Sequence, residues 1–158
     1  DVVDHALYKR PDGKWMILAA LRHAVPDHPL YAWECDKLMG KPWTDLGIQF
    51  KAESRYDEDT IKGLYAPHVI NYQGVYYAYY TTNGGMHVMK STDGRNYERI
   101  KDKRGNYDFI HKLIGRDVMI FQDDDKKYYA FSCLSTFDRN GWHQGQVIVT
   151  FGKWQNDP

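Results

Sequence analysis

The chain has 158 residues, enough for one domain with a hydrophobic core. Its 21 basic and 21 acidic side chains give a formal net charge of zero, and no long run of one sign occurs. We therefore expect neither a nucleic acid nor a membrane as partner. Thirteen Tyr, five Trp and six Phe suit β-strands and also suit a surface that stacks on sugar rings.

The two cysteines, Cys35 and Cys133, stand at no spacing typical of a metal site or redox motif, so we expect buried thiols, no cofactor and no metal. No apolar run approaches membrane-spanning length, and the first residues, DVVDHALYKR, lack the apolar centre of a signal peptide. The chain begins with Asp rather than Met, which is expected of a processed or excised piece. A secreted or periplasmic protein with its signal removed is one expectation for its compartment.

Short β-rich runs separated by Gly, Asp and Asn recur along the chain, and helix signals are nearly absent, which predicts an all-β fold. The first unit reads DHALYKRPDGKWMILAA from Asp4, then LYAWECDKLMGKPW and an edge strand, TDLGIQF. The second reads HVINYQGVYYAYYT from His68, then MHVMKSTDGRNY and YERI. The third reads DVMIFQDDDKKYYAFSC from Asp117, then GQVIVTFGKW. The segments between units, including 101–115, are expected to be surface loops.

The hairpins of the three units give an alignment. Placing Trp15, Tyr76 and Tyr128 at equivalent points and counting back aligns Asp4 with Asp117, and the shorter middle hairpin brings His68 to the same position. A four-stranded unit repeated at intervals of roughly 50 residues is typical of a β-propeller blade.

We therefore predict a single domain, a partial β-propeller of four-stranded antiparallel blades, with units at about 4–52, 66–101 and 116–158. A β-sandwich is the alternative, because sandwiches also have short strands at regular spacing.

On these residues the chain resembles the five-bladed β-propeller glycoside hydrolases of families 43 and 32 and their relatives. The segment VDHALYKRPDGKWMILAA resembles their opening blade, GLYAPHVINYQGVYYAYYT the Trp-Ala-Pro-Asp segment of the second, and GRDVMIFQDDDKKYYAF the Arg-Asp-Pro segment of the third. His68 replaces the commoner acid, and Val118 replaces the proline. The resemblance implies about three of five blades and hydrolysis of glycosidic bonds in a plant or algal oligosaccharide or polysaccharide.

The resemblance also implies roles for two carboxylates, both expected to be anionic at neutral pH. Asp4 would be the general base of an inverting enzyme or the nucleophile of a retaining one, and Asp117 would hold a sugar hydroxyl and tune neighbouring ionisation. Arg116 would either hold the Asp117 charge or bind substrate. The family's general acid is a Glu of the fourth blade, which is not visible here. Glu34 is discounted as a substitute because it falls in the third strand of a blade, away from the axis.

Further substrate contacts are expected near the axis and at the rim. His68 would face the axis and bind a sugar hydroxyl or donate a proton; the alternative is a histidine bonded to the backbone beneath the site. His5, Arg22 and Trp142 are candidate substrate-binding residues at strand ends or in rim loops, where ordinary surface residues are also common. The acidic run 123–125 is read as a solvated hairpin turn rather than a calcium site.

Carbohydrate is therefore the expected partner. The alternative function is a non-catalytic carbohydrate-binding or scaffold protein that lacks the general acid. A phosphorylase is a third reading, which Arg22 and Arg116 support weakly because it needs basic residues to bind phosphate. An incomplete ring would leave open sheet faces, so we expect a homo-oligomer or association with the missing remainder of the propeller.

Overall fold

The computed structural model describes residues 1–22, 27–39, 42–56, 58, 60, 63–82, 85–111, 116–124, 127–137 and 143–152. Within 108–111, 134–137 and 143–152 only the backbone is described. Apart from one short 3-10 turn, Ser54–Tyr56, the regular elements of this described part are β-strands, which confirms the all-β prediction. No helix among these residues is long and apolar enough to cross a membrane.

The first sheet is a four-stranded antiparallel meander of β1 (Val2–Lys9), β2 (Trp15–Leu21), β3 (Leu30–Cys35) and β4 (Thr44–Phe50), in that order. The predicted edge strand TDLGIQF coincides with β4. The β1–β2 hairpin turns at Gly13, whose φ of 87° needs a residue without a side chain.

The second sheet has the order β5 (Tyr65–Tyr72), β6 (Val75–Thr82), β7 (Gly85–Ser91) and β8 (Glu98–Arg99). A further strand, β9 (Asp108–His111), also pairs with β7. The prediction of a loop over 101–115 is therefore wrong in part. Because β8 is only two residues long and pairs with Met89 and Lys90, the rest of the β7 edge is open to β9.

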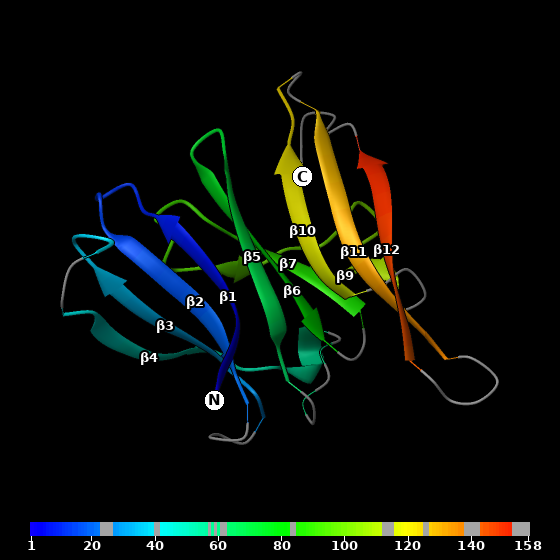
Figure 1. Cartoon of the computed structure of the whole chain (residues 1–158), viewed down its shortest axis with the longest axis horizontal. Helices are drawn as coiled ribbons and strands as arrows, with labels where there is room; N and C mark the ends of the chain where they lie inside the picture. The colour runs from blue at the N-terminus through cyan, green and yellow to red at the C-terminus, as the bar shows by residue number, and fades with distance from the viewer. Residues whose placement is uncertain are drawn as a thin grey trace.

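The third sheet has the order β10 (Arg116–Gln122), β11 (Tyr128–Phe137) and β12 (His143–Gly152). Figure 1 shows the three sheets following one another around the molecule, with β1, β5 and β10 as the strands nearest to the adjoining sheets. This radial arrangement, with the first strand of each sheet innermost, is that of propeller blades rather than of a two-layer sandwich.

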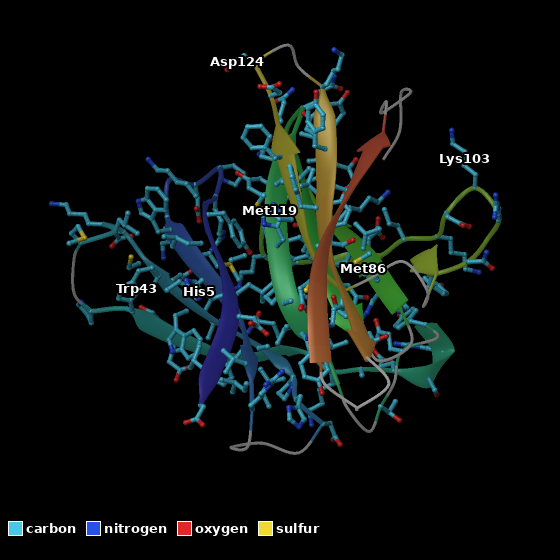
Figure 2. The ribbon with its side chains drawn as sticks, turned by 45° about the vertical axis from the view of Figure 1, so that its right-hand side comes forward. His5, Trp43, Met86, Lys103, Met119 and Asp124 are labelled. Atoms are coloured by element: carbon cyan, nitrogen blue, oxygen red, sulfur yellow. The ribbon has the colours of Figure 1, made fainter. Side chains whose placement is uncertain are left out.

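Two hydrophobic cores hold the sheets together, one between the first and second sheets and one between the second and third. Buried side chains of the first core include Tyr8, Met16, Leu18, Tyr76, Ala78 and Tyr80, and those of the second include Tyr77, Tyr79, Met86, Val88 and Val118. On the outer faces of the stack, Leu7, Ile48, Met119 and Phe121 are exposed, and Met119 is labelled on β10 in Figure 2. Association of the chain through these faces stays a prediction.

A group of ion pairs joins the first sheet to the turn between β7 and β8. The buried Glu34 carboxylate accepts from Arg10 Nη1 at 2.6 Å and from Lys14 Nζ at 2.8 Å. Arg10 Nε in turn donates to the backbone oxygen of Asp93 at 3.3 Å, and Tyr8 Oη donates to that of Gly94 at 2.9 Å. The hydrogen bond from Lys14 holds the pKa of Glu34 below its ordinary value, against the effect of burial. Glu34 is therefore a structural carboxylate.

Both cysteines are free thiols. Cys35 is buried as predicted, whereas Cys133 is only half-buried.

Replacing Glu34 by glutamine should lower the free energy of unfolding by about 2 kcal/mol, because the buried amide cannot replace charge-assisted hydrogen bonds to two cations. Since the folded-state pKa of Glu34 is lowered, its contribution is present above the ordinary pKa of Glu and is lost as the pH falls through the folded value. Urea unfolding at pH 7 and at pH 3 measures both effects. The matched control is Glu98→Gln, whose exposed pair with Lys90 at 3.3 Å should change stability by less than about 0.5 kcal/mol. Equal losses for the two variants would contradict the structural role of Glu34.

Candidate functional site

The candidate site lies where the innermost strands of the sheets begin. Asp4 on β1 has a φ of 37°, and the strand register shifts between Val3 and His5. Asp117 on β10 has a φ of 59°, and the register shifts between Arg116 and Met119. Both aspartates therefore occupy β-bulges with left-handed backbone, a conformation that Asp tolerates better than most residues. A bulge re-aims a side chain out of the regular alternation of its strand.

The second sheet has the same bulge, but its residue is Ala66, with a φ of 47°. The alignment of His68 with Asp4 and Asp117 is therefore wrong. Two residues, Ala66 and Pro67, fill the irregularity between Tyr65 and His68, and a proline, which cannot donate to the ladder, is typical of such a position. The second sheet thus contributes a methyl group where the other two contribute a carboxylate.

His68 contacts the neighbouring sheet. Its Nε2 lies 3.0 Å from the backbone oxygen of Ile120 on β10, and the imidazole is half-buried. Burial lowers the pKa of His68, and the hydrogen bond to Ile120 partly opposes this. This bond to a backbone oxygen matches the alternative stated above, in which the histidine is bonded to the backbone. A role of His68 in binding substrate stays a prediction.

Asp117 is half-buried and held from two sides. Its backbone N–H donates to Thr81 Oγ1 at 2.9 Å, and Arg116 Nη1 lies 3.3 Å from its Oδ2. Burial is the main cause that raises the pKa of the Asp117 carboxyl, and the negative charge of Asp4 raises this pKa further. The positive charges of Arg116 and Arg22 act in the opposite direction and lower it. Arg116 was expected either to hold the Asp117 charge or to bind substrate. The observed contact between Arg116 Nη1 and Asp117 Oδ2 corresponds to the first of these roles.

The bulges of Asp4 and Asp117 lie at the same end of the innermost strands of the first and third sheets, and the negative charge of Asp4 is one of the causes that raise the pKa of Asp117. Residues 113 positions apart in the sequence therefore take corresponding places in two sheets. Arg22, directly after β2, places its guanidinium 5.4 Å from the ring centre of Tyr65 at the start of β5. The backbone N–H of Arg22 donates to the oxygen of Asp1 at 2.9 Å, which fixes it beside the start of β1.

The other predicted residues fall into three groups. His5 is exposed on β1, next in sequence to Asp4, and is labelled in Figure 2. Trp142 lies outside the described residues. In the hairpin after β10, Asp123 N–H donates to the backbone oxygen of Lys127 at 2.9 Å, a turn contact. Among the described residues, no group of three His, Cys, Asp or Glu side chains is placed to hold a metal ion.

Sequence reasoning missed Thr81 and Tyr65. Thr81 is buried near the end of β6, and Tyr65 begins β5. Both lie in segments, YYTT and GLYAP, whose residues are typical of strands, so that the sequence carries no signal separating them from core positions.

The arrangement provides two carboxylates in unlike surroundings. Asp4 is exposed, whereas Asp117 is half-buried with a raised pKa and an adjacent guanidinium. Pairs of acidic groups whose environments differ in this way are suited to divide the roles of base or nucleophile and charge stabiliser.

No protein-family model matches the sequence, and a search of curated proteins found no similar sequence. Solved structures do match. A thermostable family-43 glycoside hydrolase is 22% identical with a TM-score of 0.67, over 96% of this chain and 48% of that one. An endo-arabinase from Bacteroides thetaiotaomicron is 14% identical with a TM-score of 0.65, over 94% of this chain and 55% of that one.

An α-L-arabinofuranosidase from Clostridium thermocellum is 17% identical with a TM-score of 0.63, over 94% of this chain and 56% of that one. The chain thus has the fold of these glycoside hydrolase propellers and spans about half the length of each solved structure. This confirms the partial β-propeller prediction.

Replacing Asp117 by asparagine should raise the melting temperature at pH 7. The pKa of Asp117 is raised, so the group favours folding below its unfolded-state pKa and this contribution is lost as the pH rises through the folded value. At pH 3, where the carboxyl is protonated, the difference from the parent chain should vanish. Thermal unfolding at both pH values measures it.

The control Asp117→Ala should be less stable than Asp117→Asn by about 1 kcal/mol, because the left-handed backbone costs alanine more than it costs asparagine. An Asp117→Asn chain that is destabilised at pH 7 but not at pH 3 would contradict this prediction.

Proposed function

We propose that this chain forms part of a glycoside hydrolase that acts on a plant or algal oligosaccharide or polysaccharide, with Asp4 and Asp117 as two of its catalytic carboxylates. The observation that carries the proposal is that Asp4 and Asp117 occupy equivalent left-handed bulges on the innermost strands of separate sheets of a glycoside-hydrolase-like propeller. The similar structures include an endo-arabinase and an arabinofuranosidase, so we propose glycans that contain arabinose or a related pentose as the first substrates to examine.

Hydrolysis of a glycosidic bond passes through a transition state with positive charge on the sugar ring. The exposed Asp4 suits the role in contact with water, as general base on water in an inverting reaction or as nucleophile in a retaining one. Asp117, held by its backbone and by Arg116, suits a fixed charge that stabilises the ring and accepts from a sugar hydroxyl.

The reaction also needs a protonated group that donates to the departing oxygen. Glu34 is unsuited to this role, because its ion pairs with Arg10 and Lys14 hold its pKa low and keep it ionised. We propose that the general acid comes from outside the described residues, since the similar structures are about twice as long as this chain.

Arg22, His5 and His68 are proposed as substrate contacts around the carboxylates. Arg22 is the best supported of these, because its guanidinium affects Asp117 and is held over the Tyr65 ring. An arginine on an aromatic ring is well placed to donate to sugar hydroxyls while the ring offers an apolar face.

The second candidate function is carbohydrate binding without hydrolysis. It is favoured by one observation, namely that the buried Glu34, the carboxylate considered above as a substitute general acid, is engaged in structural ion pairs. A protein of this kind would retain the carboxylates as hydrogen-bond acceptors for sugar hydroxyls.

The test combines hydrolysis of aryl arabinofuranosides and xylosides with binding of arabinan and xylan fragments by calorimetry. If the chain hydrolyses these substrates, Asp4→Asn and Asp117→Asn should each lower kcat/KM by at least about 10²-fold, because each removes a charge that acts in the transition state. The control Asp36→Asn alters an exposed aspartate after β3 and should leave kcat/KM unchanged.

Binding without hydrolysis would favour the second candidate. Hydrolysis that is unaffected by both site variants would contradict the assignment of Asp4 and Asp117.

A further inference from the structure

Thr81 belongs to the second sheet but contacts the carboxylate residue of the third. Its side-chain oxygen accepts a hydrogen bond from the backbone N–H of Asp117 at 2.9 Å, and the residue is only 6% exposed. The contact joins residues 36 positions apart in sequence and crosses from β6 to β10. A buried hydroxyl in this place therefore acts on the backbone of the site rather than on its own strand.

The Asp117 backbone needs such a partner. In the β10–β11 ladder, Arg116 pairs with Cys133 and Met119 pairs with Phe131. Asp117, which lies in the bulge between them, has no partner in the ladder. The left-handed conformation of a residue with a side chain costs about 1 kcal/mol, and an unbonded, partly buried N–H would add to that cost. The hydroxyl of Thr81 satisfies the N–H and so stabilises the bulge that directs the carboxylate.

The first two sheets supply an internal comparison. Thr81 pairs with Tyr65, the residue before the β5 bulge, and Ala20 pairs with Val3, the residue before the β1 bulge. Ala20 is thus the counterpart of Thr81 in the first sheet, and it is fully buried without a hydroxyl.

The sheet that follows Ala20 carries Ala66 at its bulge, whereas the sheet that follows Thr81 carries Asp117. The second sheet has a hydroxyl at this position, and the sheet that follows it has a carboxylate at its bulge. The first sheet has no hydroxyl there, and the sheet that follows it has a methyl group at its bulge. Packing alone does not require this difference, because both positions are buried and accept small side chains.

We propose that Thr81 is a positioning residue for Asp117, which keeps the carboxylate half-buried beside Arg116. The catalytic meaning of this role rests on the proposed function. The effect of Thr81 on the position of Asp117 does not rest on the proposed function, because it is measured on the Asp117 carboxyl and amide without any substrate.

The test uses Thr81→Val, which keeps the shape and removes the acceptor, and Thr81→Ser, which keeps the acceptor. Carbon-detected NMR titration should show the Asp117 pKa falling towards the ordinary value in Thr81→Val, as the released carboxylate turns to water. Exchange of the Asp117 amide hydrogen should become about tenfold faster. Thr81→Ser should keep the titration and the exchange rate of the parent chain.

The matched control is Thr82→Val, the next residue of β6, which is also buried and whose Oγ1 lies 3.2 Å from His87 Nε2. It loses the same hydroxyl from the same strand and should leave the Asp117 titration unchanged, even if it lowers stability. An unchanged Asp117 pKa and exchange rate in Thr81→Val, or an equal change in Thr82→Val, would overturn the inference.

Where hydrolysis is measurable, Thr81→Val should lower kcat with little effect on KM, and Thr81→Ser should restore it. A chain without hydrolytic activity would count against the proposed function, while the NMR result on Asp117 would still decide the role of Thr81.

Discussion

Left-handed backbone at the start of each innermost strand is the constraint on which the site depends. A regular strand sends successive side chains to alternate faces of its sheet, so a residue in register on β1 or β10 would project into the packing between sheets or away from it. The bulges at Asp4, Ala66 and Asp117 break that alternation once in each sheet, at the same end of the inner strand. Repeated geometry, rather than local sequence, places the two carboxylates at corresponding positions of their sheets.

The sheets that carry these bulges are fixed to one another by apolar packing and by a few polar contacts between them. Arg10, held by its ion pair with Glu34, ties the first sheet to the turn that follows β7 by donating to the backbone oxygen of Asp93. Thr81 and His68 tie the second sheet to β10 by hydrogen bonds to backbone atoms. Because these contacts lie on both sides of the second sheet, the spacing between Asp4 and Asp117 depends on that sheet, although it supplies no carboxylate at its bulge.

The part of this architecture that repeats could be predicted from the sequence. Polar hairpins between aromatic strands gave the four-stranded unit, and the equal spacing from Asp4 and Asp117 to their hairpins placed both aspartates alike. The middle unit was misaligned by two residues. Its ladder closes at Tyr72 and Val75, one residue before the aromatic pair used for the alignment, and it has one more pair between bulge and turn than the third sheet has. Strand β9 and the contact of Thr81 escaped prediction because both depend on which edge or strand lies opposite, and a single sequence does not contain that information.

The bond between His68 and Ile120 also defines which tautomer the imidazole adopts. A backbone oxygen can only accept, so Nε2 must carry the proton, and the lowered pKa leaves Nδ1 without one near neutral pH. The lone pair on Nδ1 makes the neutral ring a hydrogen-bond acceptor on that side. Its one N–H is already engaged with the adjoining sheet, so the neutral imidazole can accept a further hydrogen bond but has no second proton to donate.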